Sequence, residues 1–171
     1  MRSLILTAIG PDRPGLVEKL SATITANGGN WLGSRMAHLG GEFAGIVRVQ
    51  VADDRAPALE AALADIEGLE VSVKRDHQTA LAEPGQTVRL ELTGADRPGI
   101  VSEISRTLAA HGVNVENLDT ECVSAPMSGE ALFKAQAELA MPADLTLAEL
   151  QLALEQVASD LMVDLSLGEK D

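Results

Sequence analysis

The chain has 171 residues, of which 46% are hydrophobic and 23% charged, and its net charge at pH 7 is −13. This composition is typical of a globular protein with enough apolar material for a core, and the length allows one domain or two small ones. The 13 lysines and arginines are scattered, whereas nucleic-acid binding requires clustered basic residues that displace counterions from phosphates. We therefore expect no direct contact with DNA or RNA.

Cysteine usage and the apolar segments indicate a cytoplasmic protein. The one cysteine, Cys122, excludes an intrachain disulfide, and neither it nor the three histidines has the spacing of metal ligands. The N-terminal apolar run, residues 4–9, is too short for the core of a signal peptide, and no apolar stretch approaches the length of a transmembrane helix. We expect a chain in a reducing compartment, without a membrane contact, a metal or another cofactor.

Hydrophobic periodicity in the first half predicts a strand, a helix, a β-hairpin, a second helix and a final strand. The first strand covers residues 4–9 and leads into the turn "GPDRPG". The helix after this turn ends before Gly28, because glycine is the usual residue just past a helix C-terminus. The later expectations are a strand from Asn30, a hairpin turn at Gly40-Gly41, a strand with Val47, Val49 and Val51 on one face, a helix with Leu59, Leu63 and Ile66, and a strand over residues 71–75.

The second half predicts the same elements in the same order. Its first strand covers residues 88–93, and its first helix ends before Gly112. The loop "SAPMSGE", residues 124–130, is expected to be exposed and is a candidate contact surface for a protein partner. The later expectations are a strand from Asn114, a strand with Phe133, Ala135, Ala137, Leu139 and Met141 on one face, a helix with Leu147, Leu150, Leu154 and Val157, and a strand over residues 161–167.

The two halves are copies of one another. Residues 10–30 align without a gap on residues 94–114, so "GPDRPGLV" recurs as "GADRPGIV". Val17 recurs in this stretch as Val101, and five further positions are identical, namely Ser21, Thr23, Ala26, Gly28 and Asn30 with Ser105, Thr107, Ala110, Gly112 and Asn114. The segment 78–86 has no clear period and contains Pro-Gly, so it is the expected linker between a domain over residues 1–77 and a domain over residues 87–171.

The order β-α-β-β-α-β in each copy predicts two tandem ferredoxin-like domains of the α+β class. Right-handed crossovers place both helices of a copy on one face of a four-stranded antiparallel sheet. The opposite face of each sheet then has no covering layer. We expect the other copy or a second chain to cover these faces or the sheet edges, which predicts a homodimer.

The repeated turn can be explained by local structure. Asp12 and Asp96 are placed to act as helix N-caps, and the prolines that follow suit the first helical turn. Gly15 and Gly99 remove the side chain where another backbone or a ligand comes close. These roles account for the aspartate, proline and glycine without any ligand.

The same turn also has the chemistry of an anion site. A helix N-terminus carries partial positive charge and unpaired N–H donors, which suits a carboxylate. Arg13 and Arg97 lie in the turn without a structural need for arginine there, although each could equally pair with one of the many acidic side chains. Asn30 and Asn114, at the start of the neighbouring strands, could supply both a donor and an acceptor. From these features alone, a ligand-binding turn and a purely structural turn are equally favoured.

The segments "GPDRPGLVEKLSATITANGGNW" and "GADRPGIVSEISRTLAAHGVNV" resemble the opening of ACT domains, small βαββαβ modules that regulate amino-acid metabolism. The resemblance covers both halves. It implies that a small amino acid, with glycine or serine as first candidates, binds at an interface between modules. Matched position by position, the implied ligand-binding residues are Asp12, Arg13, Gly15, Leu16 and Asn30 in copy one and Asp96, Arg97, Gly99, Ile100 and Asn114 in copy two. Trp31 follows the asparagine in copy one where copy two has Val115, and a side chain of that size either fills a pocket or packs in the core.

Three classes of function follow from these observations. The tandem modules without a catalytic domain are similar to bacterial repressors of glycine cleavage, which implies a regulator that contacts a DNA-binding activator. A module that binds no small molecule and serves only interaction or oligomerisation is the alternative. ACT-like modules also precede the hydrolase domain of some deformylases, but an enzyme would require a nucleophile or base that the sequence does not supply.

Overall fold

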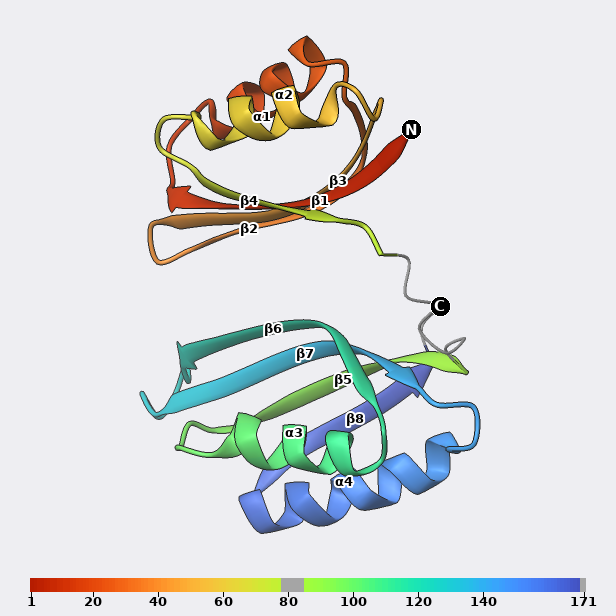
Figure 1. Ribbon diagram of the computed structural model, residues 1–171. Coiled ribbons are helices and arrows are strands. Elements are labelled where there is room, and N and C mark those ends of the chain that lie inside the picture. Colours follow the sequence, from red (N-terminus) through yellow and green to blue (C-terminus); the bar gives the residue numbers. More distant parts are fainter. Residues whose placement is uncertain (78–84, 170–171) are drawn as a thin grey trace. The chain divides into compact units, whose positions relative to one another are not determined.

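The computed structural model describes residues 1–77 and 85–169, which form two compact units. Each unit is a four-stranded sheet with two helices (Figure 1). The elements of the first domain are β1 (Arg2–Pro11), α1 (Leu16–Ala26), β2 (Asn30–Leu39), β3 (Glu42–Val51), α2 (Ala56–Ala64) and β4 (Glu70–Arg75). Those of the second are β5 (Gln86–Ala95), α3 (Ile100–Ala110), β6 (Asn114–Ser124), β7 (Ala131–Met141), α4 (Leu147–Leu161) and β8 (Val163–Glu169).

Both sheets have the predicted ferredoxin-like topology. The strand order is β2-β3-β1-β4 in the first domain and β6-β7-β5-β8 in the second, and all neighbouring strands are antiparallel. In each domain both helices cover the same face of the sheet (Figure 1). The predicted α+β fold of two βαββαβ units is confirmed. The first strand of each unit is central, so the turn that follows it emerges from the middle of the sheet.

Each domain has its own apolar core between the helices and the inner face of the sheet. Alternation along β3 shows the pattern, because every second residue from Phe43 to Val51 is buried and the intervening ones are mostly exposed. Gly40 and Gly41 both have positive φ and form the two-residue hairpin that the sequence predicted. The helix faces that complete the cores are Leu16, Leu20, Ile24, Leu59 and Leu63 in the first domain and Ile100, Ile104, Leu108, Leu150 and Leu154 in the second.

Two predicted element boundaries are wrong. Helix α2 ends at Ala64, so Ile66 lies beyond it, although its side chain still packs against the first core. In the second domain, helix α4 continues to Leu161, which was predicted to open the last strand. Met162 then adopts a left-handed conformation with φ 52°, so β8 begins only at Val163. Leu161 continues the apolar helical face of α4, and an alternating strand pattern and a helical face overlap at this residue.

The predicted linker, residues 78–86, lies outside the described residues except for Gly85 and Gln86, and the domain boundaries stay a prediction. Within residues 1–77 and 85–169, no helix combines the length and the apolar character that a bilayer span requires.

Candidate functional site

The candidate site is the turn between the first strand and the first helix of each domain, the βα corner. The helix N-caps are Gly15 and Gly99, with φ of 93° and 99°, a left-handed conformation that favours glycine. The prediction that Asp12 and Asp96 cap the helices is wrong, because neither N-terminus has a side-chain cap hydrogen bond. Pro14 and Pro98 precede the N-cap residues. They therefore lie outside the first helical turn, and the prediction that they lie within it is wrong.

Both helix N-termini leave their first amides without a side-chain acceptor. The first helical backbone bonds run from the Lys19 amide to the Gly15 carbonyl oxygen and from the Glu103 amide to the Gly99 carbonyl oxygen, each 2.9 Å. The amides between the cap and these residues therefore point outward. A Cβ added at either glycine would meet no atom within 4 Å, so the space beside each cap is open. No backbone comes close there, and the other predicted neighbour, a ligand, stays a prediction. An anion can reach these donors.

The aspartates of the two corners face different partners. In the first domain, the Asp12 carboxylate contacts Nδ1 of His38 at 2.5 Å, and the Asp12 amide donates to the Gly41 carbonyl oxygen at 2.9 Å. In the second, Asp96 faces the thiol of Cys122, and desolvation of the sulfur together with this carboxylate raises the pKa of the thiol. His38 and Cys122 hold equivalent positions, opposite Phe43 and Phe133 in the neighbouring strand. The Asp12 carboxylate thus contacts an imidazole nitrogen, whereas the Asp96 carboxylate faces a thiol, which is a weak hydrogen-bond donor.

The arginines differ in the same way. Nη2 of Arg13 donates to the backbone carbonyl oxygen of Glu67 at 2.8 Å, in the loop between α2 and β4. Gly68 allows this approach, because a Cβ there would lie 2.2 Å from the same nitrogen. Arg97 is half-buried, and its Nε makes no hydrogen bond within the described part of the chain. The first arginine is satisfied by its own domain, whereas the second has a buried donor that is not.

Asn30 and Asn114 do not join the corners of their own domains. Asn30 lies opposite Gln50, which is in turn opposite Ser3 at the start of β1, whereas the corner follows the end of that strand at Pro11. At about 3.3 Å per residue, the two ends are roughly 25 Å apart. Asn114 opens β6 in the same way. The expectation that these asparagines lie beside the turn is wrong within one domain, and each could approach a corner only from another module.

The other predicted residues lie where a helix N-terminus places them. Leu16 and Ile100 are the first residues of α1 and α3 and are buried, so they anchor the corner to the core and offer only their amides outward. Sequence reasoning missed His38 and the carbonyl of Glu67, because contacts between segments so far apart leave no local pattern. Across residues 1–77 and 85–169, no cluster of histidine, cysteine, aspartate or glutamate could hold a metal ion.

Comparison with known proteins places this geometry in a family. One model of the ACT domain matches residues 2–81 and another matches residues 88–133. The chain belongs to the ACT domain family and carries two such domains in tandem.

Relatives match this chain over nearly its whole length. The glycine cleavage system transcriptional repressor of Escherichia coli (strain K12) is 26% identical over 162 residues, which cover 92% of this chain and 85% of the repressor. A solved structure of a protein of unknown function from Galdieria sulphuraria superposes with a TM-score of 0.90 at 32% identity, over 99% of both chains. Another, provisionally assigned as a glycine cleavage system transcriptional repressor, superposes with a TM-score of 0.70 at 23% identity over 99% of this chain and 98% of its own, which shows a common fold. The tandem ACT domains and the likeness to a repressor indicate a regulatory role.

Proposed function

We propose that the chain is a non-enzymatic regulator that binds a small amino acid at the corner of its second domain and modulates transcription of amino-acid metabolism, glycine cleavage in particular, through contact with a DNA-binding activator. The observation that carries the proposal is the unsatisfied second corner. The N-terminus of α3 has no side-chain cap, and the Nε of Arg97 is buried without a hydrogen bond among the described residues. A buried donor without an acceptor costs free energy that a ligand carboxylate would recover.

The second corner also has an acceptor for an amino group. The Asp96 side chain faces the weak donor of Cys122, which leaves its carboxylate able to accept an ammonium. In the first domain, Asp12 and Arg13 already have partners within the domain. We therefore place the ligand at the second corner. Asn114 of a second copy of the chain would complete the site in a homodimer, since it cannot reach its own corner.

The protein-contact half of the proposal rests on charge and on an exposed loop. A chain with net charge −13 is repelled by DNA phosphates, so an effect on transcription requires a protein intermediary. The loop 124–130 projects Met127 fully into solvent, and an exposed apolar side chain of this kind suits a protein contact. Cytoplasmic location follows from such a role.

Calorimetric titration tests the sensing half of the proposal. Glycine and serine are titrated first, followed by the other proteinogenic amino acids, with thermal stabilisation as a second readout. Arg97→Ala is expected to weaken binding at least tenfold, whereas the matched Arg13→Ala in the first domain leaves it within twofold. Absence of heat and of stabilisation with every amino acid would leave only the protein-contact role, which recovery of a DNA-binding activator from native cytoplasm would test.

The first corner supports a second candidate function, a module for interaction or oligomerisation that binds no small molecule. Asp12 and Arg13 are both engaged within the domain, so the turn there is explained by structure alone. Under this alternative, Arg97→Ala changes assembly but no ligand response. Sedimentation of both variants at micromolar concentration separates the two functions, and a species of 18 kDa only would contradict the homodimer on which both rely.

A further inference from the structure

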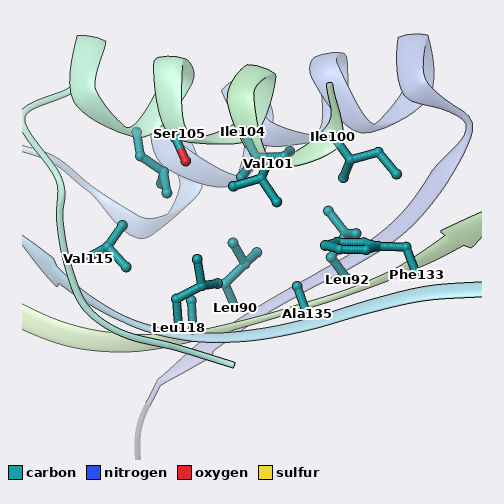
Figure 2. A pocket seen from close by; sticks show the side chains of 12 residues that line it. Leu90, Leu92, Ile100, Val101, Ile104, Ser105, Val115, Leu118, Phe133 and Ala135 are labelled. Atoms are coloured by element: carbon teal, nitrogen blue, oxygen red, sulfur yellow. The ribbon is translucent and has the colours of Figure 1, made fainter. Parts of the chain in front are cut away.

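The second domain contains an apolar cavity that the proposed function does not use. It has a volume of about 30 Å³ and lies between α3 and the sheet, where it borders Val115 and Leu118 of β6 and Phe133 of β7. Figure 2 shows side chains of the helix, including Val101 and Ser105, pointing toward those of the sheet across this space. The Ser105 hydroxyl is the one polar side-chain group among the lining residues. Such a lining offers a water molecule fewer hydrogen-bond partners than an ordered water requires, so the cavity favours apolar occupants.

The mouth of the cavity is also apolar. Val101, Val115 and Leu118 line it and are 41%, 37% and 45% exposed, whereas the floor residues Leu90 and Leu92 are buried. Hydrophobic side chains with this exposure around a concave site present apolar area to water that a bound apolar group would cover.

The first domain shows what fits at this place. Val115 lies opposite Leu139 of β7, and the equivalent residue, Trp31, lies opposite Val49 of β3. Trp31 is half-buried and packs its indole against the first core. The two domains share the same fold and register, so the position that the first fills with an indole ring carries only an isopropyl group in the second. The first domain therefore shows that an aromatic ring fits at this position of the fold.

We propose that this cavity and its mouth form a binding site for a small, neutral aromatic molecule, which takes the place that the Trp31 indole holds in the first domain. An apolar cavity of roughly 150 Å³ admits a whole benzene ring. The cavity here, at about 30 Å³, is smaller and takes only the edge of a ring, while the side chains of the mouth cover its face. A charged ring is disfavoured, because the lining residues provide no counter-charge. The inference goes beyond the proposed function and does not depend on it, since it uses neither Arg97 nor the amides of the helix N-terminus; Ile100 contributes only its buried side chain to the cavity.

Ligand-observed NMR with indole and benzene tests the proposal on the full chain. Saturation transfer is expected for both rings, with methyl shifts confined to residues such as Val101, Val115 and Leu118. Val115→Trp rebuilds the arrangement of the first domain and is expected to weaken binding at least tenfold. The matched control is Leu152→Trp, which adds the same ring at an exposed position of α4 and leaves binding unchanged.

A gain of binding provides the complementary test. Trp31→Val removes the indole from the first domain and is expected to raise the number of bound rings from one to two per chain. This variant keeps the proposal testable if Val115→Trp does not fold. Absence of saturation transfer at millimolar probe, binding that survives in a folded Val115→Trp, or methyl shifts spread over exposed residues elsewhere would each overturn it.

Discussion

Replacement of Arg13 by alanine tests whether the first corner is held by its own domain. The substitution removes the 2.8 Å hydrogen bond from the guanidinium to the carbonyl oxygen of Glu67, which joins the corner to the loop before β4. Hydrogen bonds to charged groups contribute about 1.5–3 kcal/mol, and solvent exposure of Arg13 reduces this to about 1 kcal/mol. With a slope of about 1 kcal/mol per molar urea for a small domain, the unfolding midpoint should fall by about 1 M. Arg97→Ala should leave the first domain unaffected.

Fluorescence of Trp31 provides the assay, because it is the one tryptophan of the chain and packs against the core of the first domain. Its emission therefore follows urea unfolding of that domain alone. Glu67→Ala is the matched control, since the acceptor is a backbone oxygen that the substitution retains. An unchanged midpoint in Arg13→Ala, or an equal loss in Glu67→Ala, would refute the reasoning and restore Arg13 as a residue free to bind a ligand.

Three further substitutions test other parts of the fold. Gly10→Ala places a Cβ 2.1 Å from a backbone oxygen of the loop before β4, so it should cost at least about 3 kcal/mol in the same fluorescence assay, and a near-normal midpoint would contradict the register of that strand. Thr146→Ala removes the capping box of α4 and should destabilise the second domain by about 1 kcal/mol in thermal circular dichroism. Hydrogen bonds from Thr146 lower the pKa of Glu149 below its ordinary value near 4.5. The carboxylate therefore stabilises the helix fully above that pH, and this stabilisation is lost as the pH falls through the lowered pKa. NMR titration of Glu149 should show a rise in its pKa in Thr146→Ala. Asp96→Asn should lower the raised pKa of Cys122 and speed its reaction with a disulfide reagent at pH 8, and an unchanged rate would show that the carboxylate does not act on the thiol.

The sequence was sufficient for the fold because its signals are local or repeated. Alternation of buried and exposed residues along β3 and the glycine pair at the hairpin are each visible within ten residues. Because the two copies align at a constant offset, the prediction of an element with a weak pattern in one half is supported by its counterpart in the other half. The boundaries that failed, at Ile66 and Leu161, are positions where one apolar residue fits both a helical face and the next segment.

The corners were predictable as turns but not as sites. The sequence indicates that the turn requires glycine at Gly15. The structure gives the reason, which is a left-handed backbone conformation, since no neighbouring atom lies close to this residue. It assigned Asp12 to the helix amides, whereas folding brings His38 of β2 to the carboxylate. Which of several possible partners a polar side chain contacts depends on the path of distant segments, and local spacing does not encode that path.

The two copies of the domain differ in how far each satisfies its own polar and apolar groups. The backbone of the corner is the same in both, with an uncapped helix behind a left-handed glycine, so the duplication preserved the donors. Side chains elsewhere differ between the copies: at the corner, His38 of the first copy is replaced by Cys122 in the second, and at the start of the second strand Trp31 is replaced by Val115. The larger residues supply the first domain with internal partners and filling. The second domain has neither residue, and an open apolar cavity borders Val115. Independently of this exchange, the Nε of Arg97 is buried without an acceptor among residues 1–77 and 85–169. A duplicated module whose one copy satisfies its own polar and apolar groups, while the other does not, is the arrangement expected when one copy maintains structure and the other binds.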